Sequence, residues 1–401
     1  MEEPRIYFTN ARVITPYRSI ERGWVTIEGT RIEGVGEGTP RILAGALVVD
    51  VSGRYLTPGF IDLHVHGGGN ADVMDRSPQA LVEMAAAHAR GGTTAMLPTT
   101  VASSIEEIYQ VIDCFNEAKK LCYPGAKLLG LHLEGPYFAP GERGAQDPRY
   151  IKNPDPKEYM PLLDYSQDIL RVSAAPEIPG GLAFGAELRR RGILAAIAHT
   201  NATYDEVIKA MEAGYTHATH LYSSMKGVHR VDLYRVAGGV EAAYLIDEMT
   251  VELIADGKHL PPALLKLAYK IKGPSRIALI TDAMRAAGMP EGQYVLGGKD
   301  SGLLCLVEDG VAKLLDGTAF AGSVATANLL VRNMVRLAEV PILDAVKMMT
   351  ITPARILGIS NRKGVLAPGM DADLVVFGDD FEIVLTMVEG RVVYNVLGCT
   401  V

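Results

Sequence analysis

Cysteine is scarce in this sequence, with 4 residues in 401. The cysteines show neither C-x-x-C spacing nor a pattern of pairs, and they stand at Cys114, Cys122, Cys305 and Cys399. Such spacing gives no support for a disulfide framework, because bridged domains use many regularly placed thiols. We therefore expect reduced, mostly structural thiols, as in a cytoplasmic protein.

Long apolar runs and a positive net charge are also missing. No uninterrupted apolar run approaches the roughly 18 residues that a membrane-spanning helix needs. The segment Met1 to Arg5 is acidic and lacks an apolar core, so we expect no signal peptide. The net charge of −8 offers no basic surface for nucleic acid, and an anionic ligand would need a local basic pocket. We expect a soluble cytoplasmic protein without nucleic-acid or membrane partners.

The two ends of the chain have the same β-like texture. With 48% hydrophobic and 21% charged residues the composition is that of a globular protein, and 401 residues favour two domains or a barrel with an accessory domain. Residues 1–57 and 362–401 consist of short strand-like runs separated by glycine and proline. We predict that these ends pair into one small β-sandwich domain, with residues 58–361 inserted between them.

The middle of the chain alternates apolar strand-like runs with helical stretches such as 77–90 and 204–213. Near-continuous apolar runs such as 193–198 are typical of strands covered on both faces of a parallel sheet. The pattern indicates the α/β class and a (β/α)8 TIM barrel; a doubly wound open sheet is the alternative, because a strand count cannot prove closure. The predicted strands are 60–66, 93–100, 127–134, 169–176, 193–199, 216–221, 250–256 and 276–282.

The first of these strands carries the strongest chemical signal. Within 60–66, apolar residues alternate with Asp62, His64 and His66, and this period of two is that of a β-strand. Residues two apart on a strand point the same way, so the two imidazoles form a ready pair of metal ligands. A bound metal would activate water for hydrolysis. The alternative is a half-buried strand that carries two histidines by chance.

Other titratable residues also gather where predicted strands end, which is where a barrel keeps its reactive groups. Glu134 follows the third strand, and a carboxylate beside histidines is costly without a cation, so we predict that it bridges metal ions. Asp282 ends the eighth strand and is predicted to be catalytic, unless it caps a helix. Six of the nine histidines lie at or just beyond strand ends, namely His64, His66, His199, His220, His229 and His259.

The remaining three histidines have no predicted role in the metal centre. His88 lies inside a predicted helix and is expected to be a packed or surface residue. His132 and His217 lie on predicted strands. We expect both to point away from the ligand face and to belong to the core or to the surroundings of the ligands.

Six short segments together resemble the amidohydrolase superfamily and, within it, the N-acetylglucosamine-6-phosphate deacetylases. The resemblance covers nearly the whole chain, including the split β-domain and the late segment 321–323. An H-x-H pair after a strand is shared by many amidohydrolases, whereas the L-E-G-P and T-D-A segments together are far more specific. The segments are 58–67 (PGFIDLHVHG), 131–136 (LHLEGP), 175–177 (APE), 199–200 (HT), 218–222 (ATHLY) and 281–283 (TDA).

The resemblance implies a centre of two divalent ions, zinc or ferrous iron, with single occupancy as a further possibility. The first ion would be held by His64 and His66 with Asp282 beside it, Glu134 would be shared, and His199 and His220 would complete the second site. The implied reaction removes the acetyl group of N-acetylglucosamine 6-phosphate, giving glucosamine 6-phosphate and acetate. Metal-activated hydroxide would attack, with Asp282 as general base and then general acid.

The resemblance also implies substrate contacts and a homodimer. Ala145 would contact the sugar through its backbone, and Gln146 stands where some relatives carry a histidine that polarises the carbonyl. His259 would bind the 6-phosphate together with an arginine from a neighbouring subunit, for which Arg230 is the best match and Arg235 the other candidate. The pocket would be lined by Phe320, Ala321 and Gly322.

Two departures concern the sugar and not the chemistry. Ser223 and Ser224 replace the usual Asn-Ala that binds substrate, and 230–233 (RVDL) replaces the usual Arg-Glu-Pro-Gly. A deacetylase of another N-acyl amino sugar, such as N-acetylgalactosamine 6-phosphate, is therefore the alternative. No lysine occupies the bridging position, which counts against cyclic-amide hydrolases that use a carboxylated lysine. A metal-binding scaffold without activity is the alternative from a different class.

Overall fold

The two ends of the chain pair into one small β-domain, as the sequence predicts, and its strands belong to one eight-stranded sheet. In the computed structural model, which describes residues 5–398, the sheet has the order β25-β24-β23-β5-β1-β2-β3, with β4 beside β1. The ends meet where β23 pairs antiparallel with β5. The strands are β1 (Ile6–Ile14), β2 (Ser19–Glu28), β3 (Arg31–Glu37), β4 (Leu47–Asp50), β5 (Tyr55–Pro58), β23 (Leu374–Phe377), β24 (Ile383–Val388) and β25 (Arg391–Asn395).

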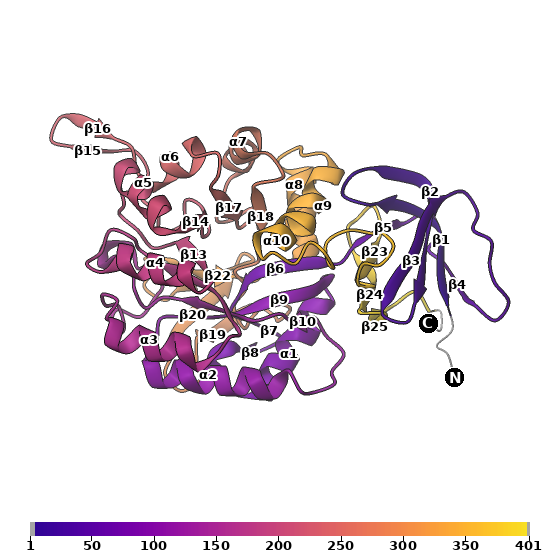
Figure 1. Ribbon diagram of the computed structural model, residues 1–401, viewed down its shortest axis with the longest axis horizontal. Helices are drawn as coiled ribbons and strands as arrows, with labels where there is room; N and C mark the ends of the chain where they lie inside the picture. Colours follow the sequence, from indigo (N-terminus) through magenta and orange to yellow (C-terminus); the bar gives the residue numbers. More distant parts are fainter. Residues whose placement is uncertain (1–4, 399–401) are drawn as a thin grey trace.

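One apolar core holds this small domain together. Phe8 and Val25 from the N-terminal strands and Leu374 and Met387 from the C-terminal strands are all fully buried in it. Neither end could bury these side chains alone, so the domain depends on both. Figure 1 shows it beside the barrel. Of the predicted range, residues 1–4 and 399–401, with Cys399, lie outside the described residues.

The middle of the chain forms the predicted parallel barrel. Its strands follow the order β9-β11-β12-β13-β14-β17-β18, with β6 paired to β9. The ring closes where the Asp282 backbone N–H donates to His64 O (2.9 Å) and that of His66 donates to Ala283 O (2.9 Å). The strands are β6 (Phe60–Val65), β9 (Thr93–Thr100), β11 (Leu131–Glu134), β12 (Ile169–Ala174), β13 (Leu194–Ile197), β14 (Tyr215–Ala218), β17 (Thr250–Leu253) and β18 (Ile277–Leu279).

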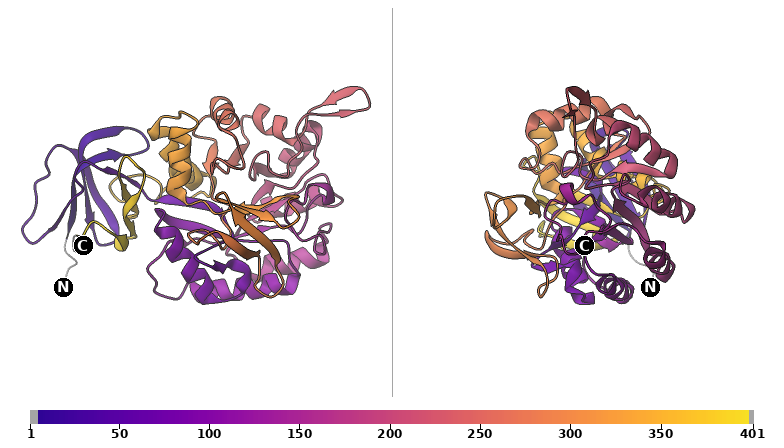
Figure 2. Two further views of the ribbon diagram at one scale, coloured as in Figure 1. Left: turned by 180° about the vertical axis from the view of Figure 1, so that it is seen from behind. Right: turned by 90° about the vertical axis from the view of Figure 1, so that its left-hand side faces the viewer.

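Helices cover the outside of the barrel (Figure 1; Figure 2). The predicted helix 204–213 has the bounds of α5, where Thr203 and Glu206 form a capping box. In α2 the buried residues Ile108, Val111, Ile112 and Phe115 recur at helical spacing and face the core. The helices are α1 (Pro78–Ala89), α2 (Ile105–Ala118), α3 (Pro156–Tyr165), α4 (Gly181–Arg190), α5 (Tyr204–Ala213), α6 (Gly239–Leu245), α7 (Pro262–Lys272), α8 (Ala327–Arg336), α9 (Ile342–Met349) and α10 (Ile351–Ile356).

Two antiparallel insertions were not predicted. The hairpin of β15 (His229–Val231) and β16 (Tyr234–Val236) projects away from the barrel, as Figures 1 and 2 show. A second sheet consists of β19 (Gly292–Leu296), β20 (Leu303–Glu308), β21 (Val311–Leu314) and β22 (Phe320–Ser323). Shorter elements are β7 (Gly67–Gly68), β8 (Ala71–Asp72), β10 (Lys127–Leu128), η1 (Val73–Asp75) and η2 (Pro140–Glu142). Among the helices of residues 5–398, none has the length and apolar content that crossing a membrane requires.

Candidate metal centre

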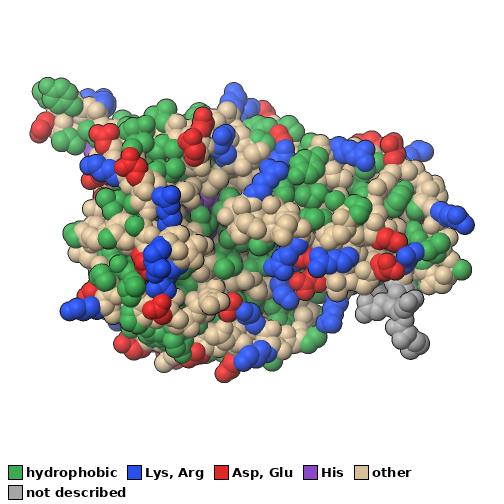
Figure 3. Space-filling view, in the orientation of Figure 1, with side chains coloured by type: hydrophobic (Ala, Val, Ile, Leu, Met, Phe, Trp, Pro, Cys, Tyr) green, Lys and Arg blue, Asp and Glu red, His purple; other side chains and the backbone are tan. Residues whose placement is uncertain are grey.

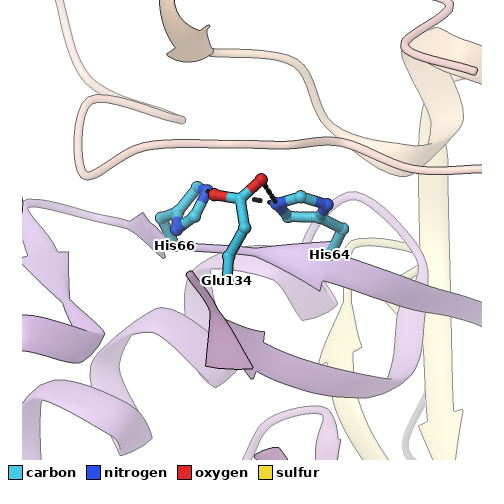
Figure 4. Close-up of side chains that lie close together, drawn as sticks. All are labelled: His64, His66 and Glu134. Atoms are coloured by element: carbon cyan, nitrogen blue, oxygen red, sulfur yellow. Dashed lines mark hydrogen bonds and ion pairs between the residues drawn. The ribbon is translucent and has the colours of Figure 1, made fainter. Parts of the chain in front are cut away.

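Five of the predicted ligands form two overlapping groups at the carboxyl end of the barrel. His64, His66 and Glu134 make the first half-site, and Glu134, His199 and His220 make the second half-site. In each group the donor atoms lie within 4.8 Å of one another, and all five side chains are buried. Figure 4 shows Glu134, at the end of β11, reaching between His64 on β6 and His66, which follows that strand.

The Glu134 carboxylate faces all four imidazoles. Its Oε1 lies 3.0 Å from His220 Nε2, 3.4 Å from His199 Nε2 and 3.5 Å from His64 Nε2. Its Oε2 lies 3.5 Å from His66 Nε2. Oε1 thus faces both histidines of the second half-site and one of the first, and Oε2 faces the other. A carboxylate that reaches both histidine pairs in this way can serve as a ligand shared by two cations.

Asp282 lies beside the first half-site. Its Oδ1 is 3.1 Å from His66 Nε2 and 3.3 Å from His64 Nε2. The next element in the chain is the strand β19, so Asp282 does not cap a helix, and that alternative is wrong. The carboxylate belongs to the same cluster as the four histidines.

Three of these residues have a left-handed backbone conformation. The φ angles are 47° for His199, 28° for His220 and 48° for Asp282. Positive φ in residues other than glycine costs about 1–3 kcal/mol and persists only where the surrounding structure imposes it. Each residue follows a strand that ends earlier than predicted. The chain therefore turns at these positions, and the ligand side chains leave the strand direction.

The donor set fits a cation. His199 Nε2 is buried without a hydrogen-bond partner, which suits a metal ligand. Burial raises the pKa of Glu134, but His64, His199 and His220 outweigh it and hold that pKa well below the ordinary value. Burial lowers the pKa of His64, but Glu134 and Asp282 outweigh it and raise the pKa to about 10. In the metal-free site, a proton on the His64 imidazole therefore supplies the positive charge that a cation would bring. The nitrogen and oxygen donors of the site suit zinc or iron.

Metal loading is expected to release protons. At pH 8 the His64 imidazole of the metal-free protein is protonated, because its pKa is about 10, and a ligand must be neutral to bind. Proton release is therefore nearly full at pH 8 and declines as the pH rises through about 10. Calorimetric titration of the metal-free protein with zinc, in buffers of different ionisation enthalpy, measures the proton count. A heat independent of the buffer, or equal release by the His64→Asn variant, contradicts this.

A cavity of about 450 Å³ opens over the cluster. The part of the chain that the structure describes brings to its wall most residues predicted to contact substrate, namely Ala145, Gln146, Ser223, Ser224, His259, Phe320 and Gly322. Ala321 is fully buried in a small apolar core and does not line it. Arg230 and Arg235 lie on the projecting hairpin, away from the cavity wall.

Two of the wall residues have fixed side-chain orientations. Gln146 Oε1 accepts the Ala102 backbone N–H at 2.7 Å, so its amide nitrogen donates to Glu134 Oε2, also at 2.7 Å. His259 Nδ1 donates to Asp256 Oδ2 at 2.7 Å, which leaves Nε2 available to a ligand. Gln146 therefore presents a donor at the metal centre, and His259 presents its second nitrogen at the cavity wall.

The expectation that His132 and His217 point away from the ligand face is wrong. His132 and Glu134 are two apart on β11 and share a face, and the His132 ring centroid is 4.7 Å from that of His64. His217 Nε2 lies 3.3 Å from a buried carboxylate oxygen of Glu252. Both histidines are fully buried, which agrees with the predicted core role.

The other histidines divide as follows. His88 is packed as expected, with Nε2 donating to Gly67 O at 2.8 Å. His229 lies on the hairpin strand β15, so its place after a predicted strand does not bring it to the centre. Sequence reasoning also missed Arg143, which lines the cavity, and the buried pair of Arg171 and Glu252. A charged residue within an apolar run was the available signal for that pair.

Known proteins resemble this chain over almost its whole length. Residues 55–393 match the amidohydrolase family. The chain is 36% identical to an N-acetylglucosamine-6-phosphate deacetylase of Lysinibacillus sphaericus, over 85% of this chain and 86% of that protein. It is 35% identical to an N-acetylgalactosamine-6-phosphate deacetylase of Escherichia coli O157:H7, over 92% and 96%.

One solved structure has a similar fold over almost the whole chain. It is an aspartate-to-alanine variant of N-acetyl-D-glucosamine-6-phosphate deacetylase from Mycobacterium smegmatis, in complex with N-acetyl-D-glucosamine-6-phosphate. The TM-score is 0.90 at 32% identity, covering 98% of this chain and 100% of that chain. The similarity therefore includes both the barrel and the sheet built from the two chain ends.

Proposed function

This chain belongs to the amidohydrolase family, and we propose that it removes the acetyl group of N-acetylglucosamine 6-phosphate, giving glucosamine 6-phosphate and acetate. The observation that carries the proposal is one buried carboxylate, Glu134, facing four imidazoles beneath an open cavity, with Asp282 beside them. The relatives that act on phosphorylated N-acetyl amino sugars support the substrate class.

The side chains divide the work between holding metal and moving a proton. His64, His66, Glu134, His199 and His220 would hold two divalent ions, zinc or ferrous iron. Ions bound there would lower the pKa of water and polarise the acetyl carbonyl. The five side chains would thereby keep the water and the acetyl carbonyl close together while the amide bond breaks.

Asp282 moves the proton. Burial raises its pKa, but His64 and His66 outweigh that effect and lower it below the ordinary value, so the carboxylate is ionised at neutral pH. It accepts a proton from the attacking water and passes it to the amine nitrogen as the carbon–nitrogen bond breaks. Gln146, held as a donor beside Glu134, orients the acetyl carbonyl.

The phosphate needs more positive charge than one chain brings to the cavity. Arg143 is the one arginine or lysine among the described residues that line it, and His259 is the predicted phosphate contact. We propose that Arg230, on the hairpin, completes the phosphate site of a neighbouring subunit in a homodimer. A phosphorylated sugar does not cross membranes unaided, so we place the reaction in the cytoplasm.

The hairpin has the surface of an interface. Leu233 is 87% exposed and Tyr234 is 78% exposed, and Figure 3 shows an apolar tip standing apart from the body. Apolar side chains gathered in this way mark contact sites in soluble proteins. Light scattering is expected to give twice the chain mass of 43.1 kDa. A monomer at assay concentration contradicts the dimer and leaves the metal chemistry untouched.

Arg230→Ala is expected to raise KM for the phosphorylated sugar about 10- to 100-fold, because a charge-assisted hydrogen bond is worth about 1.5–3 kcal/mol. The kcat should change little, since the arginine does not touch the amide. Arg235→Ala is the matched control on the opposite strand of the hairpin. A large KM effect in Arg235→Ala alone transfers the phosphate contact to that residue.

Acetate release from four sugars tests the function directly. The expected order is N-acetylglucosamine 6-phosphate first, with the unphosphorylated sugar at least about 100-fold lower in kcat/KM because two charged contacts are lost. The panel also contains N-acetylgalactosamine with and without the 6-phosphate, because one relative is an N-acetylgalactosamine-6-phosphate deacetylase. A higher kcat/KM for N-acetylgalactosamine 6-phosphate makes that sugar the substrate. If the metal-loaded protein releases no acetate from any of the four sugars, the proposed deacetylase activity is wrong.

A further inference from the structure

A buried ion pair lies inside the barrel next to two of the proposed metal ligands. Arg171 on β12 and Glu252 on β17 are paired, and neither side chain is exposed to solvent. Arg171 also donates to Leu63 O at 3.1 Å and to Thr219 Oγ1 at 2.8 Å. Burying two charges carries a large desolvation penalty, and the reaction described above does not use this pair.

Glu252 contacts a ligand of each half-site. Its Oε2 accepts from His64 Nδ1 at 3.4 Å and from the His220 backbone N–H at 3.2 Å. Its Oε1 is paired with Arg171 and lies 3.3 Å from His217 Nε2. Both oxygens therefore face donors, and the His220 contact holds a backbone whose φ is positive.

His64 differs from the other three histidines of the centre in the hydrogen-bond partner of its Nδ1. Its Nδ1 faces a carboxylate, whereas each of the others donates Nδ1–H to a backbone carbonyl. Those carbonyls belong to Thr99 for His66 (3.1 Å), Glu142 for His199 (2.8 Å) and Ser223 for His220 (3.1 Å). A carboxylate partner orients the ring and makes the other nitrogen a stronger metal donor.

We propose that Glu252 is a positioning residue of the metal centre, holding the His64 ring and the His220 backbone, with Arg171 keeping its carboxylate in place. The effect is greater at the first half-site, because there Glu252 contacts the ligand side chain itself. The proposal rests on the metal centre described above and is independent of which sugar is the substrate.

Glu252→Gln tests this role. An amide offers one acceptor oxygen where the carboxylate offers two, so either Arg171 or the pair of His64 and His220 loses its acceptor. We expect zinc affinity at the first half-site to fall about 10- to 100-fold, as for other partners of metal-bound histidine. Titration of the metal-free protein with zinc gives the affinities, and circular dichroism confirms folding.

Three further variants decide the outcome. His199→Ala leaves only the first half-site, so adding Glu252→Gln to it reports that site alone. Asp373→Asn removes a buried carboxylate paired with Lys363 (2.6 Å), and it should leave zinc affinity unchanged even if it lowers stability. If Glu252→Gln does not fold, Glu252→Asp keeps the charge but withdraws the oxygens by one methylene, and it should bind zinc less tightly than the wild type.

Zinc affinity within threefold of the wild type in the folded Glu252 variants overturns the proposal. An equal loss in Asp373→Asn overturns it too, because the effect is then one of general stability. If the wild type binds a single ion, the two-ion centre is wrong, and the change in affinity for that ion still decides the role of Glu252.

Discussion

Asp282→Asn is expected to lower kcat for deacetylation by about 10³-fold, because general acid–base catalysis contributes about 10²- to 10⁴-fold. Asparagine has nearly the same shape and can still bind metal through its oxygen, but it cannot take up the proton of water. At least one ion per chain should remain bound through the other five side chains. Acetate release under saturating substrate, with metal analysis of the same sample, makes the measurement.

Asp300→Asn is the control for this change. Asp300 is an exposed aspartate in the turn between β19 and β20, and its loss should change kcat less than twofold. A metal-binding scaffold without activity predicts no difference between the two variants. Full turnover by Asp282→Asn with metal bound assigns the proton transfer to another group.

Glu134→Gln is expected to have the largest effect of all. The substitution removes the negative charge that faces four imidazoles, and it leaves one amide oxygen where the carboxylate offers two oxygens to the two half-sites. Both ions should bind weakly, and activity should fall by at least about 10³-fold, because water is no longer activated. Metal analysis after dialysis measures the loss of binding, and acetate release measures the loss of activity.

Glu158→Gln serves as the matched control. Glu158 is a half-buried carboxylate on α3 that accepts from Tyr137 and Lys152 and contacts no ligand of the centre. Its variant should keep the metal content and turnover of the wild type. If Glu134→Gln retains two ions and full activity, the bridging role is refuted.

The barrel strands could be predicted because they are buried on both faces. A run such as 193–198 has no polar face, and this excludes an exposed strand. The strand ends were placed too late, since β13 ends at Ile197 and β18 at Leu279. His199 and Asp282 leave the strands with positive φ, and a hydrophobic pattern carries no information about such turns.

The clustering of the proposed metal ligands could be predicted because their positions follow from parallel strands. All carboxyl ends meet at one end of a barrel, so polar residues after different strands must come together. The insertions could not be predicted in this way. In β15 and β16, residues such as Tyr234 are exposed, so burial imposes no alternating pattern there.

The surroundings of the ligands were the least predictable part. Arg171 and Glu252 interrupt apolar runs, which signals a buried ion pair, but two charged residues far apart in sequence do not reveal their partners. The face of His132 could have been read from its spacing to Glu134, since residues two apart on a strand share a face. The alternation rule that identified His64 and His66 applies there as well.

Anomalous diffraction from crystals loaded with zinc or iron tests the central claim most directly. We expect two metal peaks within the cluster, both bound by Glu134, one also by His64 and His66 with Asp282 beside it, and the other by His199 and His220. Metal peaks elsewhere in the protein, with these six side chains binding none, would contradict the account.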